Sequence, residues 1–572
     1  MEIVAGVSTK VTTDTVDFNG EIADKRYTGG RRASSFIIWN EAAERMAFFS
    51  IAVNMVSYLV TQMHESLPEA ATHVSDWVGA SYFLTLLGAF LADSYLGRFK
   101  TIVVFSSIYA LGMVLLTLGA TLDNLHPPPC VDKICPPPTT IQNGFIYLAL
   151  ALIALGTGGI KPCVSSFGAD QYDEGDEKEA QDKYSFFNWF FFAINMGVLV
   201  GITLVVYIQV VKGWGWGFGT PTIIVILSIL ILLAGSRFYR YQRPTGSPFT
   251  RFAQVLVAAL INKWHGVGRQ NCSVDVLYEL TESEKSDIPG ARKLEHTKQY
   301  SFLDKAAMTT TTAPRPSNSS RWRLCTVTQV EELKSFLRIL PIWATTIALS
   351  ISFAQLSTFF VSQAKIMDRK LSPNFTIPTG SVTIFGALNG LIVIPLYEMV
   401  LVPFTRRFTG HPRGMTSLQR IGVGLFISIF ALISAATIEK KRRESQNPSD
   451  VTVFWLLPQF FLVGSAEVFA YVGQLEFFYD EATDGTRSLS SAMFLSEIGI
   501  GSWLNTGLVK IVLRLSGGEE KGWLRNDLNR SRLDYFYWVI AGINMLNFCG
   551  FQELFSDYNS QIFRIADLEC VF

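Results

Sequence analysis

Three charged side chains interrupt an apolar run near the start of the chain, FIIWNEAAERMAFFS. Glu41, Glu44 and Arg45 occupy positions i, i+3 and i+4, so a helix would place them on one face. An arginine beside two carboxylates is partly neutralised, and protonating one glutamate frees the guanidinium for another anion. The pattern therefore suits the coupling of a proton to anion binding. The alternative is a structural ion cluster that locks helix packing.

Two further charges lie inside long apolar runs. Lys161 precedes Pro162, and Glu467 lies within FLVGSAEVFAYVGQLEFF. The lysine could hold an anion inside the protein or extend to the water at a helix end. The glutamate could line the same site, or it could be a protonated side chain at a helix interface. Arg45 and Lys161 on one wall with Glu467 on the other would suit a zwitterion such as a short peptide.

The elements that carry these charges are predicted to cross a membrane. The chain is 49% hydrophobic and only 17% charged, against about 25% charged residues in an ordinary soluble domain. A helical span needs about 20 mainly apolar residues, and the runs are too continuous for the alternating strands of a barrel. We predict an all-α membrane protein with twelve transmembrane helices in two six-helix bundles. The runs lie near 36–62, 77–95, 101–122, 144–165, 186–209 and 219–238, and then near 335–360, 380–403, 418–437, 452–476, 488–513 and 534–551.

These runs define the expected domains. They are an N-terminal segment 1–35, a first bundle 36–238, a central loop 239–332, a second bundle 333–551 and an atypical C-terminal tail 552–572. Lysine and arginine favour the cytosolic side, which places both termini and the central loop there. The supporting residues are Lys25, Arg26, Arg31, Arg32, Arg98, Lys100, Arg406, Arg407 and Arg413; Lys440, Lys441, Arg442 and Arg443 fall on the other side.

Three motifs suggest covalent changes at the two faces. Cys130 and Cys135, in HPPPCVDKICPPP on the predicted outer side, could form a disulfide or stay as two free thiols. Asn374 begins an outer glycosylation sequon. Thr101 follows Arg98-Phe99-Lys100 and could accept a phosphate or cap a helix.

Other functional classes find no support in the sequence. A net charge of +0 offers no field for nucleic acid. His265 and His296 lack partners at metal spacing, and no Walker-type phosphate loop is present. We therefore expect no enzyme activity, no metal and no cofactor, with protons as the coupling ion. The expected partners are the lipid bilayer and a small-molecule substrate, in the plasma membrane or the vacuolar membrane.

Several longer motifs point to one family. They are Glu41-Ala42-Ala43-Glu44-Arg45, GAFLADSYLGRFKT from Gly88, GTGGIKPCVSSFGADQYDE from Gly156, FFNWFFFAIN from Phe186 and GQLEFFYDEA. Together they resemble the proton-dependent oligopeptide transporter family of the major facilitator superfamily, in its plant nitrate and peptide branch. The resemblance covers about residues 30–548. It implies the major facilitator fold, a central site between the bundles and alternating access.

The resemblance also implies residue roles. Glu41, Glu44 and Arg45 would couple protons, Lys161 would bind the carboxylate end of a substrate, and Glu467 would pair with its amino end.

Five further positions follow from the same resemblance. Asn195 would be a polar contact of the site or a helix-packing amide. Phe353 stands ahead of an AQL segment, where nitrate-handling relatives can carry a histidine, and a phenylalanine cannot donate a hydrogen bond to an anion. Asp93 and Arg98 would form a cytosolic charge latch, with Gly88 allowing a close helix approach.

The chain departs from the family pattern in two places. Peptide-transporting relatives often carry tyrosines just after the first motif, where this chain has Met46, Phe48 and Phe49. Helix 12 is apolar only from about Tyr535 to Phe551, which predicts a short last helix or an unusual isoform.

The favoured function is a proton-coupled symporter that imports di- or tripeptides or similar small zwitterions. The alternatives are a proton-coupled transporter of nitrate or another small anionic plant metabolite or hormone, and a transport-silent nutrient sensor.

Overall fold

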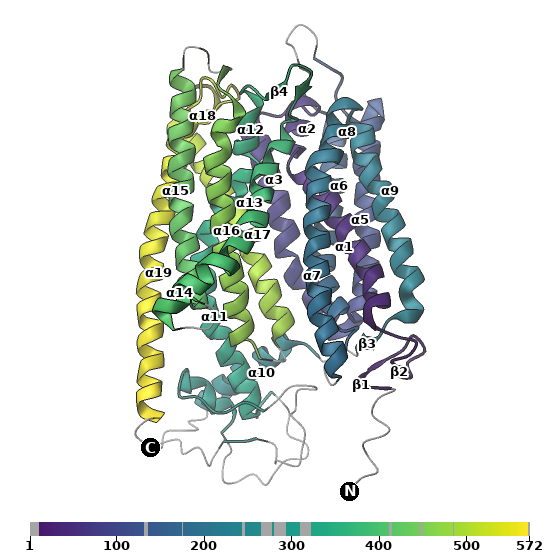
Figure 1. Cartoon of the computed structure of the whole chain (residues 1–572), viewed down its shortest axis with the longest axis vertical. Coiled ribbons are helices and arrows are strands. Elements are labelled where there is room, and N and C mark those ends of the chain that lie inside the picture. Colours follow the sequence, from purple (N-terminus) through teal and green to yellow (C-terminus); the bar gives the residue numbers. More distant parts are fainter. Residues whose placement is uncertain are drawn as a thin grey trace.

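Two groups of long helices stand side by side in the computed structural model (Figure 1). Strand β1 (Val11–Val16) and the C-terminal part of α19 (Leu533–Glu569) lie at the same end of the molecule as helix α10 (Pro248–Trp264), and we call this end the terminal face. The other end is the opposite face. The structure describes residues 11–130, 135–173, 176–242, 246–264, 277–279, 293–308, 322–410, 414–445, 447, 450–483 and 486–569.

The first group of helices forms the first bundle. It comprises α1 (Gly30–Ala52), α2 (Met55–Thr61), α3 (Leu67–Phe83), α4 (Thr85–Leu91), α5 (Arg98–Thr121), α6 (Thr140–Ala169), α7 (Glu177–Val200), α8 (Val206–Val211) and α9 (Trp214–Ala234). Short π-helical turns, η1 (Ala92–Leu96) and η3 (Gly201–Val205), extend α4 and join α7 to α8.

The second bundle follows α10 along the chain. It comprises α11 (Val327–Phe353), α12 (Phe359–Lys365), α13 (Ile384–Leu396), α14 (Val402–Thr409), α15 (Ser417–Glu444), α16 (Leu457–Glu481), α17 (Arg487–Ser516), α18 (Gly518–Lys521) and α19 (Leu533–Glu569). Capping boxes begin three long helices, because Thr139, Thr326 and Thr416 each exchange hydrogen bonds with a glutamine three residues later.

Ten helices of the described chain are long and apolar enough to cross a membrane. Two more belong to the bundles by packing: α1 lies against α7 and α9, and α19 lies against α15 and α11. Three charges in the middle of α1 lower its apolar character, as expected from Glu41, Glu44 and Arg45. The prediction of an all-α membrane fold is confirmed, and the chain is an integral multi-pass membrane protein.

The end of the last helix differs from the sequence prediction. The apolar stretch stops near Phe551, but α19 continues without a break to Glu569. The helix is therefore not short, and the boundary placed between a bundle and a tail at 551/552 does not mark a helix end. Polar residues can continue a helix once it has left an apolar environment, because each added residue closes one more backbone hydrogen bond.

A small sheet at the terminal face was not predicted. Strand β1 (Val11–Val16) pairs with β2 (Ile22–Asp24) and β3 (Tyr241–Gln242), all antiparallel. It ties the N-terminal segment to the chain just after α9.

Lys25 directly follows β2. Burial works against a charged lysine at this position, but the hydrogen bonds and charges of Asp173 and Asp176 raise the pKa of Lys25.

Glycines allow the closest helix contacts. A Cβ atom on Gly88 of α4 would meet the backbone carbonyl of Gly158 in α6, and one on Gly159 would meet the ring of Phe105 in α5. The close approach expected at Gly88 is therefore present, and it fixes α6, the helix that carries Lys161.

The two bundles touch in the half of the molecule near the opposite face. Asn505 of α17 donates a hydrogen bond to the Ser75 hydroxyl of α3 at 3.2 Å, and Thr506 donates to the carbonyl of Thr72 at 3.2 Å. An apolar cluster around Val53 and Val206 adds contacts from the start of α13. These contacts close the opposite face in this conformation.

Candidate functional site

Four of the charges singled out in the sequence meet at one place in the first bundle. The Arg45 Nε atom lies 2.7 Å from Glu41 Oε1 and 3.6 Å from Glu44 Oε2. The Lys161 Nζ atom, from α6, lies 3.3 Å from Glu44 Oε1. The Lys161 side chain is 0% exposed, so the lysine does not extend to the water. We call these four residues the charge cluster.

Glu44 is held in the charge cluster by charge alone. Both of its carboxylate oxygens are buried and make no hydrogen bond to the described residues, and the same is true of Lys161 Nζ. The distance between Lys161 Nζ and Glu44 Oε1 is short enough for attraction, but the ammonium and the carboxylate are not aligned as hydrogen-bond donor and acceptor. Arg45, by contrast, donates a hydrogen bond to Glu41. Glu44 is therefore the carboxylate whose interactions are purely electrostatic.

Aromatic rings cover the lysine of the charge cluster. Its Nζ atom lies 4.1 Å from the ring centroid of Phe48 and 5.1 Å from that of Tyr82. Phe48 also stacks on Trp77 at 5.1 Å. Phe48, one of the positions without the tyrosine of many relatives, thus supplies a cation–π face in place of a hydroxyl.

Tyr82 connects the charge cluster to the second bundle, and sequence reasoning missed it. It lies close enough to Arg45 and Glu44 on one side and to Glu467 on the other for their charges to act on its hydroxyl. Glu467 is partly buried on α16, and no ion pair joins it to Arg45 or Lys161 within the described chain. Tyr82 carries no recognisable sequence signal, since a tyrosine in an apolar helix is usually a packing residue.

The structure separates the two remaining predicted substrate contacts. Phe353 ends α11 and packs edge-on against Tyr471 of α16 at 6.0 Å, one helical turn from Glu467. Asn195 is exposed on α7, and its amide donates to the carbonyl of Phe191 at 2.8 Å. Phe353 thus lies beside the face of α16 that carries Glu467, whereas Asn195 does not join the charge cluster, and the roles of both stay predictions.

The expected latch at the terminal face has a different main partner. Arg98 NH1 donates to both carboxylate oxygens of Asp170, at 2.5 and 2.6 Å, while its Nε atom lies 3.8 Å from Asp93. Asp170 stands just after α6, in the GADQYDE segment. Sequence spacing suggested Asp93 because it is close to Arg98 along the chain, whereas Asp170 reaches Arg98 only through the packing of α6 against α5.

The candidate modification sites differ in access. The Thr101 side chain is buried and its hydroxyl donates to the carbonyl of Gly97 at 3.0 Å, so a kinase would not reach it in this conformation. Asn374 is exposed in the turn between β4 (Lys370–Ser372) and β5 (Phe375–Thr376). That position fits glycosylation, which stays a prediction.

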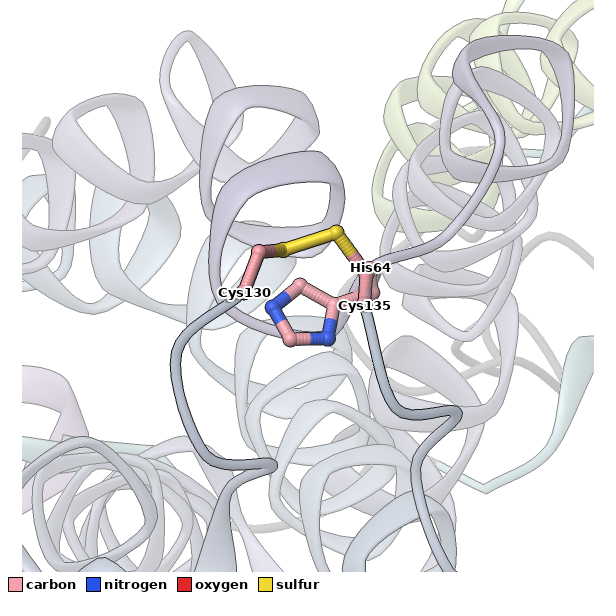
Figure 2. Close-up of side chains that lie close together, drawn as sticks. All are labelled: His64, Cys130 and Cys135. Atoms are coloured by element: carbon pink, nitrogen blue, oxygen red, sulfur yellow. A yellow bond between two sulfur atoms is a disulfide. The ribbon is translucent and has the colours of Figure 1, made fainter. Parts of the chain in front are cut away.

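Cys130 and Cys135 form a disulfide near the opposite face, the first of the two alternatives (Figure 2). His64 lies beside it and approaches the carbonyl of Pro136 at 2.9 Å. These sulfur atoms are bonded to each other and therefore do not offer thiolate ligands to a metal.

A second group of metal-type ligands lies near the terminal face. His296, Asp304 and Glu331 come together there. The two carboxylates already pair with Lys334, each at 2.7 Å. An ammonium between the carboxylates occupies the place that a cation would take.

Comparisons with known proteins show the family and the fold of the chain. The model of the POT family, PTR2, matches residues 99–524. Two Arabidopsis thaliana proteins, NRT1/PTR FAMILY 8.2 and 8.1, are 48% and 45% identical over 544 residues, covering 93% of this chain and 94% and 95% of their own lengths. The solved structure of the POT family transporter PepTSo superposes with a TM-score of 0.68 at 21% identity, covering 93% of this chain and 99% of that chain. An auto inhibited POT family peptide transporter gives 0.64 at 21%, covering 91% and 96%. At these identities the solved structures show a shared fold, while the relatives and the family model show common descent.

Proposed function

The chain belongs to the POT family and is a membrane transporter rather than an enzyme, and from this premise we propose that it imports di- or tripeptides, or similar small zwitterions, together with protons. The observation that carries the proposal is the placement of opposite charges in the two bundles. Arg45 and Lys161 lie in the first bundle, and Glu467 lies in the second without an ion-pair partner in the described chain.

A zwitterion matches this layout. The carboxylate of a peptide would approach Arg45 and Lys161, and its ammonium would pair with Glu467. Tyr82, which interacts with both sides, would lie along the peptide backbone and could donate its hydroxyl proton to a carbonyl. A ligand that bridges the two bundles would bind each by a charge-assisted contact, and these are stronger than neutral hydrogen bonds.

Proton coupling would act through the charge cluster. While Glu44 is ionised, it attracts both Arg45 and Lys161 and competes with the substrate for them. A proton on Glu44 removes that attraction and leaves the two cations available to a carboxylate. Proton and substrate would then bind together, because each makes the other's binding more favourable.

The direction of release follows from the bundle contacts. The opposite face is closed by α3 and α17 in this conformation. Loss of the proton from Glu44 would restore its pairing with the cations and displace the substrate carboxylate toward the terminal face.

A small anion is the second candidate substrate. The cations Arg45 and Lys161 would serve nitrate or an anionic metabolite equally well, and the relatives' names include NRT1. Glu467 favours the zwitterion, since an anion has no group for it to pair with.

Current in voltage-clamped oocytes tests the proposal. At acidic external pH, alanyl-alanine should evoke an inward current in the wild type. That current should vanish in Arg45→Ala and persist in Lys440→Ala, which alters an exposed cation of α15. A protein at the cell surface that is silent to a dipeptide panel but responds to nitrate would replace the peptide proposal with the anion one.

A further inference from the structure

A second buried carboxyl lies inside the second bundle, away from the charge cluster. Glu497 of α17 is 0% exposed. Its Oε2 atom accepts hydrogen bonds from the Thr346 hydroxyl of α11 and the Gln474 amide of α16. Its Oε1 atom is buried and has no hydrogen-bond partner among the described residues.

Glu497 differs from the other fully buried carboxyls of the described chain. Glu41 pairs with Arg45, Glu332 with Arg251 and Glu439 with Arg442, but no ion pair is formed by Glu497 in this part of the structure. Burying an ionised carboxylate without a cation is energetically unfavourable, and a bound proton removes that cost. The surroundings therefore favour the neutral, protonated form of this side chain.

One face of α16 joins Glu497 to the proposed substrate site. Glu467, Tyr471 and Gln474 are spaced i, i+4 and i+7, so they line one side of the helix. Tyr471 lies close enough to both Glu467 and Glu497 for their charges to act on its hydroxyl, and Gln474 donates a hydrogen bond to Glu497. Because α16 runs toward the terminal face, Gln474 lies about 10 Å nearer to that face than Glu467 along the helix axis.

We propose that Glu497 is a second proton-binding carboxyl of the transporter, which holds a proton in this conformation and exchanges it with Glu467 on the way to the terminal face. The inference rests on the proposed proton-coupled function. In the transfer toward the terminal face, the proton leaves the carboxyl of Glu467, which becomes a carboxylate, and the carboxylate of Glu497 becomes neutral; the return reverses this. The total charge of the pair does not change.

Among the residues that the structure describes, no cation acts on Glu497. From α11, Thr346 and Ser350 face this region with hydroxyls. From α16 the titratable groups are Glu467 and Tyr471, and from α3 the group that reaches them is Tyr82. The nearest cations of the first bundle, Arg45 and Lys161, are held by Glu41 and Glu44.

Infrared spectroscopy of the full-length protein in liposomes tests the proton directly. The wild type should show the carbonyl band of a protonated carboxylic acid, which disappears as the pH is raised. Glu497→Gln should lose this band. Glu476→Gln, which changes a partly exposed α16 carboxylate paired with Arg420, should keep it. Thr346→Val removes one donor to the carboxylate, so its band should persist to higher pH than in the wild type.

Transport by the same variants tests the use of the proton. The reversal potential of the alanyl-alanine current should show fewer protons per peptide in Glu497→Gln than in Glu476→Gln, with a flatter dependence on external pH. A band that survives in Glu497→Gln overturns the proposal. A second result would also overturn it: the wild-type band does not change with pH, and Glu497→Gln transports the wild-type number of protons per peptide. The carboxyl would then be a structural hydrogen-bonding group. If the wild type carries no alanyl-alanine current, the peptide proposal fails, and the infrared result still decides whether Glu497 holds a titrating proton.

Discussion

At the scale of single residues, the buried charges were the part of the site that the sequence predicted best. Glu41, Glu44 and Arg45 could be placed together because i, i+3 and i+4 spacing is local to one helix. Lys161 could be singled out because a lysine within an apolar run has few alternatives. Their actual meeting, with Lys161 3.3 Å from Glu44, depends on how α1 and α6 pack and could not be read from spacing.

The residues that sequence reasoning missed share one property. Tyr82, Asp170 and Glu497 each act through a partner far away along the chain: Glu467, Arg98 and Gln474. Glu497 carried a usable signal, since it is a carboxylate in the middle of an apolar helix. The other two have types that are ordinary in their local context.

Four cations at the end of α15 lie on the side of the membrane where lysine and arginine are not expected, and carboxylate partners within the protein explain this for two of them. Arg442 is 0% exposed and bonded to Glu439 through its NH2 atom at 2.8 Å, and Arg443 lies 3.0 Å from Asp534. Lys440 lies 3.9 Å from Glu444, and Lys441 stacks over the ring of Trp455. Arg442 and Arg443 on the predicted outer side are thus neutralised by carboxylates within the protein, while Lys440 and Lys441 make only surface contacts.

Arg442→Ala tests this explanation. It leaves Glu439 as a buried carboxylate without its cation, so the free energy of unfolding should fall by about 3–5 kcal/mol. Denaturant unfolding in mild detergent measures the change. The neighbouring exposed pair is the matched control: Lys440→Ala should change stability by no more than about 1 kcal/mol. Equal effects of the two substitutions would show that the Arg442 pair does not differ from a surface ion pair.

At the scale of elements, the helices followed from long apolar runs, and the small sheet did not. Six or more consecutive turns of apolar residues have one solution in a membrane, the helix. The strands β1, β2 and β3 are short, and their pairing joins segments more than 200 residues apart, such as Val16 and Tyr241. The extension of α19 to Glu569 was missed because hydropathy reports where a helix leaves the apolar region, not where it ends.

Gly88→Ala tests the close contact between α4 and α6. The added Cβ atom would meet the carbonyl of Gly158, and overpacking of this kind costs about 1–3 kcal/mol. Gly144→Ala makes the same change in α6 where nothing lies within 4 Å, and it should be neutral or slightly stabilising because alanine favours a helix. Thermal stability of the detergent-solubilised proteins should separate the two variants. If Gly88→Ala is as stable as Gly144→Ala, the helices do not need this contact.

At the scale of the whole molecule, the two bundles and their closed face give the proposed cycle its direction. The contacts of α17 with α3 lie toward the opposite face. The charge cluster lies within the first bundle, nearer to the terminal face than these contacts. A substrate that bridges Arg45 and Glu467 would hold the bundles together across the site. The number of helices and the two-bundle arrangement were predictable from the sequence, whereas the conformation depends on contacts between bundles that no local pattern encodes.

The most direct test of the account is alanyl-alanine transport by Glu44→Gln in proteoliposomes. Two quantities are compared: accumulation driven by an imposed proton gradient, and exchange of labelled for unlabelled dipeptide without a gradient. A glutamine resembles the protonated glutamate but cannot release a proton. We predict that Glu44→Gln loses accumulation and keeps exchange, while Glu476→Gln retains both. Accumulation by Glu44→Gln up to the wild-type level would contradict the central claim that Glu44 couples proton to substrate.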